Sequence, residues 1–195
     1  VSGTDVYLGG NFVSAGGVQR KNLARISHTT KTADLTWAPE LNSTATEMVI
    51  DGASLYLAGY FTTVNGTARG RGARISTTDG SLGVWDPVSD AVINTIVTDG
   101  VNVYAGGPFT QIGGESINRL AKLNNSTGAA DATWNPNPNQ EVLTIALLNN
   151  NLYAGGYFTS IGGQSRNYIA RIPLVANEAG NADGWNPNSS SIVMT

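Results

Sequence analysis

Cysteine is absent from the 195-residue chain, and charged residues make up only 13% of it. The first absence excludes disulfide bonds and thiolate metal sites and leaves the redox compartment open. The charged share is low against a usual value of about 25%, and the formal net charge is −3. No basic face is available to hold a phosphate backbone, so nucleic acid is not an expected partner.

Histidine occurs only at His28, and long apolar runs are missing as well. A His-based metal site or catalytic dyad would need partners that are absent, so His28 is predicted to be a solvated loop residue. The longest apolar runs, such as 142–148, are far shorter than the roughly 20 residues of a membrane helix, so no membrane span is expected. Because the chain begins at Val1 without Met or an apolar leader, we expect a processed chain or an excerpt of a longer one.

What the chain does contain is one string repeated four times. The clearest copy is LYAGGYFTSIGG at 152–163, and the others begin at Val6, Leu55 and Val103. The Phe of each copy recurs at intervals of 61−12=49, 109−61=48 and 158−109=49 residues. The four Trp residues recur at 85−37=48, 134−85=49 and 185−134=51, each followed two residues later by Pro. Two independent markers therefore give one period.

Each period contains signals for four short strands, clearest in the last copy. The apolar run 142–148 ends at an Asn-rich turn, where earlier copies have the hairpin dipeptide Asp-Gly. The second strand is expected over 152–158 and the third over 168–174. A short fourth strand is expected at the Trp, ended by the Pro that cannot donate to a sheet ladder. No stretch shows sustained helical periodicity.

This pattern predicts an all-β fold, a β-propeller of four repeats in which each repeat is a four-stranded antiparallel blade. The whole chain, 1–195, forms one domain with repeats at about 1–45, 46–93, 94–142 and 143–191. Large repeated rings are expected to fill the space between blades as core, not as a ligand site. These rings are Tyr7, Phe12, Trp37, Tyr56, Phe61, Trp85, Tyr104, Phe109, Trp134, Tyr153, Phe158 and Trp185.

The repeated string, followed by RNYIARI at 166–172 and then Trp-x-Pro, resembles the bacterial delta-sixty type propeller repeat of large secreted and surface-attached proteins. It is also similar to kelch repeats, which pair a double glycine with a downstream Trp. The resemblance implies a propeller, an extracellular or cell-surface location and membership of a longer multidomain protein, and it implies no catalytic residues. The second copy departs from the pattern, with Ala58 and Asn65 at glycine positions.

The two ends of the chain are out of phase with the repeat. The first blade lacks its first strand at the N-terminus, and the beginning of such a strand stands at 192–195. One interpretation is that 192–195 completes the first blade of the same chain. The other is that it completes a blade in a neighbouring copy, or in the next part of a longer chain, by strand addition.

One basic residue recurs at the same place in every repeat, at Arg25, Arg74, Lys122 and Arg171. A ring of cations that binds an anionic sugar or carboxylate is one interpretation. The favoured one is structural: the head groups lie between blades and donate to carbonyls or stack on rings. Replacing Arg74 with Met is then expected to lower stability without affecting any ligand.

No motif indicates catalysis, a metal or a cofactor. Isolated Asp-Gly pairs at Asp51, Asp79 and Asp99 are interpreted as turns, because a calcium loop needs a run of spaced oxygen ligands. The glycines do not form a phosphate loop, since no Gly-Lys-Ser/Thr follows them. We therefore expect no enzyme, no metal and no cofactor.

Two function classes remain open. The first is a recognition or adhesion module whose loops, 14–20, 66–72 and 113–117, contact a glycan or a protein. The second is a structural element of a surface layer or filament that self-associates through 192–195. A lower alternative is a glycoside-processing enzyme, because propellers can host carboxylate pairs, although Asp and Glu are scattered among turns here.

Overall fold

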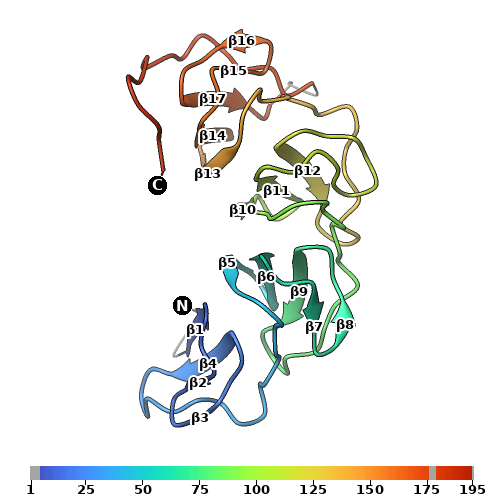
Figure 1. Ribbon diagram of the computed structural model, residues 1–195, viewed down its shortest axis with the longest axis vertical. Helices are drawn as coiled ribbons and strands as arrows, with labels where there is room; N and C mark the ends of the chain where they lie inside the picture. Colours follow the sequence, from blue (N-terminus) through green and yellow to red (C-terminus); the bar gives the residue numbers. More distant parts are fainter. Residues whose placement is uncertain (1–4, 176–178, 195) are drawn as a thin grey trace.

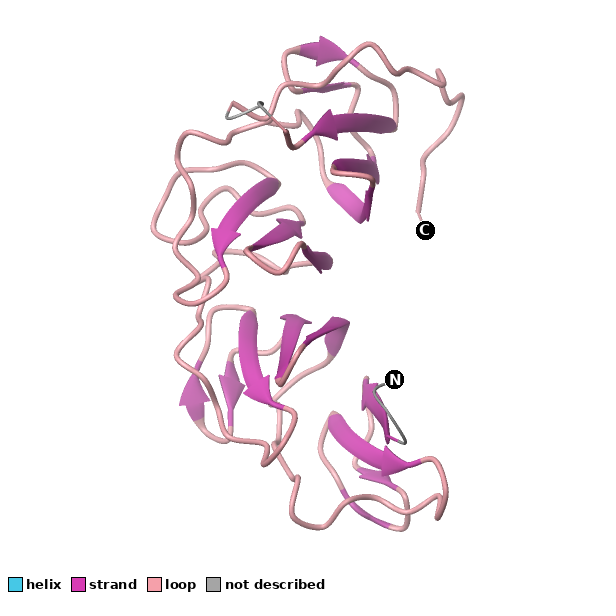
Figure 2. Ribbon diagram, turned by 180° about the vertical axis from the view of Figure 1, so that it is seen from behind, coloured by secondary structure: helices cyan, strands magenta, loops and turns pink. Residues whose placement is uncertain are grey.

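A computed structural model describes residues 5–175 and 179–194 and shows strands and loops without a helix in these ranges (Figure 2). The strands are β1 (Asp5–Gly9), β2 (Ser14–Ala15), β3 (Val18–Gln19), β4 (Leu23–Ser27), β5 (Ala45–Asp51), β6 (Ser54–Gly59), β7 (Thr63–Val64), β8 (Thr67–Ala68), β9 (Gly72–Ser76), β10 (Thr95–Thr98), β11 (Asn102–Gly106), β12 (Leu120–Asn124), β13 (Val142–Leu148), β14 (Asn151–Gly156), β15 (Ser160–Ile161), β16 (Gln164–Ser165) and β17 (Ile169–Pro173).

The strands form four antiparallel units that follow the sequence repeat. Three units contain a three-stranded sheet, β5-β6-β9, β10-β11-β12 and β13-β14-β17, and the first contains the pair β1-β4. Short hairpins, β2-β3, β7-β8 and β15-β16, are added outside these sheets. We name the units by their residues: first, 5–44; second, 45–92; third, 93–141; fourth, 142–192.

The units follow one another along an open arc (Figure 1). Strands β1, β5, β10 and β13 lie on its concave side, and the small hairpins lie on its outer side. Consecutive concave strands contact one another: β1 with β5, β5 with β10, and β10 with β13. The first and fourth units stand apart at the two ends of the arc, and no sheet closes on itself among residues 5–175 and 179–194.

The register places the repeated Tyr opposite the repeated basic residue in every unit. The pairs are Tyr7 with Arg25, Tyr56 with Arg74, Tyr104 with Lys122, and Tyr153 with Arg171. Cross-strand neighbours of this kind lie about 4.5–5.5 Å apart at Cβ, close enough for the long side chains to run side by side. Each unit therefore presents a phenol and a cation on the same face.

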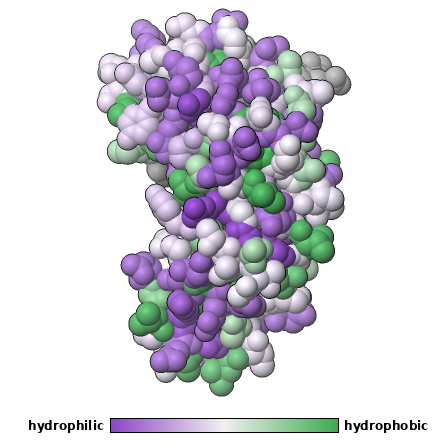
Figure 3. Space-filling model, turned by 45° about the vertical axis from the view of Figure 1, so that its right-hand side comes forward, coloured by the Kyte–Doolittle hydropathy of each residue, from purple (hydrophilic) through white to green (hydrophobic). Residues whose placement is uncertain are grey.

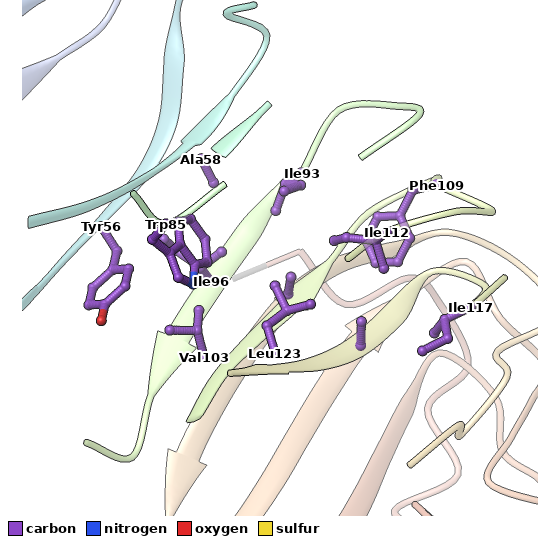
Figure 4. Packing of buried hydrophobic residues seen from close by; sticks show 12 residues of the cluster. Tyr56, Ala58, Trp85, Ile93, Ile96, Val103, Phe109, Ile112, Ile117 and Leu123 are labelled. Atoms are coloured by element: carbon purple, nitrogen blue, oxygen red, sulfur yellow. The ribbon is translucent and has the colours of Figure 1, made fainter. Parts of the chain in front are cut away.

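The hydrophobic core lies between the units. One cluster contains Tyr56 and Trp85 of the second unit together with Ile96, Val103 and Leu123 of the third (Figure 4). Equivalent clusters join Tyr7 and Trp37 to the second unit, and Tyr104 and Trp134 to the fourth. The rings of Tyr and Trp meet edge to face at 5.2 Å in the first and second units, a favourable aromatic geometry. A unit's own Tyr–Trp pair is thus covered by the next unit.

The twelve predicted core rings do not all have the same burial. Nine are buried, whereas Phe12, Tyr153 and Trp185 are half-buried. Phe12 belongs to the two-stranded first unit. Tyr153 and Trp185 belong to the fourth unit, beyond which no further unit stands among the described residues.

The expected fourth strand at the Trp is wrong. After the third strand the chain makes one isolated bridge, such as Ile26 to Ala33 or Leu123 to Ala130, and then leaves the sheet. In the first unit an Asp side chain favours the departure: Asp34 Oδ1 accepts hydrogen bonds from the amides of Thr36 and Trp37 at 2.8 and 3.0 Å. Such local hydrogen bonds favour a turn over a further strand. Among the described residues the main sheets have two or three strands and not four.

The structure also differs from one of the two interpretations of 192–195, that this segment completes the first sheet of the same chain; the other, strand addition to a neighbouring copy or to the next part of a longer chain, stays a prediction. Residues 192–194 belong to no strand, and Thr195 lies outside the described residues. Val193 packs on Gly155: its Cγ1 lies 2.8 Å from the position that a Cβ on Gly155 would occupy. Val142 of the fourth unit packs on Gly106 of the third in the same way, at 2.7 Å. Val193 therefore takes the place that the first residue of a following unit would occupy.

Candidate functional site

The junctions between the units are the places where polar side chains converge. At the first junction, Tyr7 and Arg25 both donate to the carbonyl of Thr77 in the next unit, the Tyr7 hydroxyl at 3.4 Å. The Trp37 Nε1 donates to the neighbouring carbonyl of Ser76 at 2.8 Å. Three side chains of one unit therefore bind two consecutive carbonyls of the next.

The second junction repeats this arrangement. The Tyr56 hydroxyl and Arg74 Nη1 donate to the carbonyl of Asn125 at 2.8 and 3.0 Å. The Trp85 Nε1 donates to the carbonyl of Asn124 at 3.0 Å. Arg74 of the second unit is thus hydrogen-bonded to the third unit.

The third junction is different. The Tyr104 hydroxyl donates to Asp99 Oδ2 at 3.1 Å, and Lys122 Nζ donates to Asp131 Oδ2 at 2.9 Å, both within their own unit. The Trp134 Nε1 is buried and has no hydrogen-bond partner. None of these three groups reaches the fourth unit through a hydrogen bond of the kind seen at the first two junctions.

Two sequence changes account for the difference. Lysine replaces arginine at position 122, so the planar, multiply donating head group is lost. The turn of the fourth unit is also longer: Ile172 to Ala182 spans 182−172=10 positions, against 130−123=7 from Leu123 to Ala130. The third junction thus differs from the first two in its basic residue and in the length of the facing turn.

An open cavity of about 470 Å³ lies at this third junction. The third unit contributes the β10–β11 turn and the exposed end of its sheet: Thr98, Asp99, Asn102, Tyr104 and Lys122. The fourth unit contributes the β13–β14 turn and the segment after β17: Leu147, Leu148, Asn149, Asn150, Leu174 and Val175. We call this cavity the third-junction pocket.

The charged side chains of the pocket already have polar partners. Burial alone would raise the pKa of Asp99, but hydrogen bonds from the Asn102 and Val101 amides and from Tyr104 outweigh it and hold the pKa below its ordinary value. Burial and the Asp99 charge raise the pKa of Tyr104, so the phenol stays protonated. The Thr133 hydroxyl, aided by Lys122, lowers the pKa of Asp131 to about 2. The pocket therefore offers amides, hydroxyls and a paired cation.

The concave side of the same junction is closed by hydrogen bonds. Asn94 Nδ2 donates to Glu141 Oε1 at 2.8 Å and to the Val142 carbonyl at 2.9 Å. The Ile145 amide donates to Thr95 Oγ1 at 3.4 Å. The third and fourth units are therefore hydrogen-bonded to each other on the concave side of this junction, and the pocket opens on another side of it.

The remaining predicted residues lie elsewhere. Arg171 pairs with Asp183 at 2.6 Å and lies over the Trp185 ring at 6.0 Å. His28 is exposed in the turn after β4. Of the loops expected to contact a ligand, 14–20 contains the hairpin β2-β3 and 66–72 contains β8, both on the outer side of the arc, and 113–117 has a single bridge from Ile112 to Glu115. The arrangement does not bring the four basic residues together into one cation ring, because each pairs within or across its own junction.

Asp99, Asn149 and Asn150 enter the pocket although the sequence marks them only as turn residues. Two signals point to this place: the single Lys among the four repeated basic residues, and the Trp spacing of 51 in the last repeat. Within the described ranges, no three His, Cys, Asp or Glu side chains are grouped so as to hold a metal ion. The same ranges contain no helix that could cross a bilayer.

A match to a family model supports the propeller organisation. The family model described as a domain of unknown function (DUF5122) β-propeller matches residues 148–172, which run from the end of β13 into β17. The chain is also similar to the crystal structure of BamB from Moraxella catarrhalis, with a TM-score of 0.49 and 18% sequence identity. That similarity covers 91% of this chain and 52% of BamB, so the chain spans about half the length of that protein. No curated protein matches the sequence.

Proposed function

We propose that the chain is part of a β-propeller, with its four units as blades, that acts as a non-catalytic recognition or adhesion module in an extracellular or cell-surface setting. The resemblance to the delta-sixty repeat supports the location and stays a prediction. The outer surface supports it too: in Figure 3 most of the visible face is hydrophilic or neutral, with separate small hydrophobic patches.

The third-junction pocket is the proposed ligand site, and its departure from the repeat is the observation that carries the proposal. The first two junctions use their Tyr, Arg and Trp donors to bind the next unit, and the third does not. The third-junction pocket, about 470 Å³, is larger than the cavity of about 370 Å³ that Ser54, Arg74 and Gly83 line in the second unit.

The lining indicates the class of ligand. Lys122 is ion-paired with Asp131, and the Asp99 carboxylate accepts hydrogen bonds from neutral groups, so this lining offers no unpaired cation for an anionic ligand. The exposed amides of Asn149 and Asn150 and the hydroxyl of Thr98 can bind hydroxyl groups, and Leu147 and Leu148 offer an apolar face. A small number of placed polar groups beside apolar surface is typical of such sites. We therefore propose a neutral glycan as the ligand.

A glycan array with neutral and acidic members tests the proposal. Asn149→Gly/Asn150→Gly keeps the positive φ of 50° and 58° at these positions and removes both amides, so it is expected to abolish binding of neutral glycans. Asn188→Gly is the matched control, since Asn188 is exposed, has a φ of 51° and lies outside the pocket lining. Absence of glycan binding by the native chain, or binding that survives the double substitution, would refute the proposal.

A further inference from the structure

The outer end of the fourth unit carries a surface that is covered at every internal junction. In the first three units the Trp-x-Pro motif is buried: the Trp residues are at most 1% exposed, and Pro39, Pro87 and Pro136 are buried. In the fourth unit Trp185 and Tyr153 are half-buried and Pro187 is exposed. We call the group Tyr153, Arg171, Trp185 and Pro187 the terminal aromatic face.

This face keeps the geometry of the buried junctions. The rings of Tyr153 and Trp185 meet edge to face at 5.3 Å and 89°, against 5.2 Å and 86° for Tyr56 and Trp85. Arg171 is fixed by Asp183 over the Trp185 ring. The side chains are thus arranged for a partner although none of the described residues covers them as the next unit does at the other junctions.

The internal junctions show what fits against such a face. Each Trp-x-Pro motif packs on a glycine of the next unit, at Gly80, Gly128 and Gly180, and all three have positive φ, of 76°, 87° and 74°. A Cβ at these glycines would come within 3.2 Å of Trp37, 2.6 Å of the Asp86 carbonyl and 2.9 Å of Pro136. A partner unit therefore needs glycine at this turn.

The first unit of the same chain lacks that glycine. The Lys31 amide donates to the Ser27 carbonyl at 2.9 Å, as the Gly80 amide donates to the Ser76 carbonyl at 3.0 Å, so the two turns are equivalent. Lys31 has the same left-handed backbone, with a φ of 64°, but it carries a Cβ and a charged side chain. A Trp-x-Pro motif placed here as at the other junctions would collide with Lys31.

We propose that the terminal aromatic face is a docking surface for a further repeat unit with glycine at this turn, and that Lys31 prevents the first unit of a second copy from docking there. The surface is separate from the third-junction pocket. The proposal also argues against self-assembly of the native chain through its two ends, because Lys31 blocks the turn of the first unit that would contact the terminal aromatic face of another copy.

Substitution of Lys31 in the full chain tests the proposal by creating the missing partner. Lys31→Gly gives the first unit the glycine, so the chain is expected to self-associate head to tail. The dissociation constant of this association is expected to be about tenfold lower than that of the native chain, or lower still; tenfold is equivalent to about 1.4 kcal/mol. Sedimentation equilibrium over a concentration series measures this, and circular dichroism verifies the fold. The native chain is expected to remain monomeric over the same range.

Three further variants identify the surface. Lys31→Asn removes the charge and tolerates positive φ but keeps a Cβ, so it is expected to stay monomeric. Lys31→Gly combined with Trp185→Ala, or with Pro187→Asp at the exposed proline, is expected to return to the monomer. A folded Lys31→Gly chain that stays monomeric would overturn the proposal, as would association that survives both second substitutions or that Lys31→Asn also shows. Glycan binding is measured separately, so either proposal can fail alone.

Discussion

The second and third junctions of the arc use the same residue positions for different purposes. At the second, Tyr56, Arg74 and Trp85 all donate across the boundary to the third unit. At the third, Tyr104 and Lys122 bond within their own unit, and Asn94 on the concave side donates across the boundary to the Val142 carbonyl. A repeat can thus keep its packing while the hydrogen bonds of one boundary change, provided that a second set of bonds holds the units together.

Truncation of the buried Trp residues is expected to have the largest effect. Trp85→Ala should destabilise the chain by about 3–5 kcal/mol, because a fully buried ring is lost from the core between two units. Equilibrium urea unfolding measures the change.

A milder pair of substitutions separates packing from hydrogen bonding. Trp85→Phe removes a bond to the Asn124 carbonyl and should cost about 0.5–1.5 kcal/mol more than Trp134→Phe, since Trp134 Nε1 has no partner to lose. Equal losses at the two positions would show that the junctions do not differ in this respect.

The repeated basic position gives a second comparison between the same two junctions. Arg74→Met removes a charged hydrogen bond to the next unit and is expected to cost about 1.5–3 kcal/mol. Lys122→Met removes only a partly exposed ion pair with Asp131, worth about 0–1 kcal/mol. Melting temperatures compare the two, and an unchanged value for Arg74→Met would contradict the structural role of the Arg.

The acid response gives the smallest and most local difference. The pKa of Asp131 is lowered to about 2, so its contribution to stability is complete above the ordinary Asp pKa of about 4 and is lost as the pH falls through 2. The Thr133 hydroxyl is its main cause, whereas Arg25 is the main cause of the lowered pKa of Asp34.

Titration of the Asp34 and Asp131 carboxyl groups by NMR therefore distinguishes the first junction from the third. Arg25→Met should raise the pKa of Asp34 clearly, and Lys122→Met should raise that of Asp131 less. A larger rise at Asp131 would mean that the Lys122 ion pair is stronger than the third junction suggests.

Much of the fold is readable from the sequence because the period is carried by large rings. The second and third strands of each unit follow directly from the apolar runs and their glycines, and the sheets β5-β6-β9 and β13-β14-β17 lie close to the predicted positions. The strand expected at the Trp is absent although propensity favours a strand there; in the first unit the hydrogen bond that Asp34 accepts from the Trp37 amide favours a turn.

The third-junction pocket could be anticipated only in part. Lys122 among three arginines and the long last repeat are visible in the sequence, but where the carbonyls of a lengthened turn lie is a matter of three-dimensional packing. Lys31 is similar: its register with Gly80 is clear once the turns are superimposed by their amide hydrogen bonds. Departures from a repeat are therefore easier to find than to interpret.

The position of the core between the units determines how the chain could be divided. Each hydrophobic cluster takes its Tyr and Trp from one unit and most of its aliphatic residues from the next. A fragment cut at the boundaries of the sequence period would expose half of a core at each cut. The smallest fragment with an intact core is a pair of consecutive units, so truncation or shuffling of this chain should proceed in overlapping pairs.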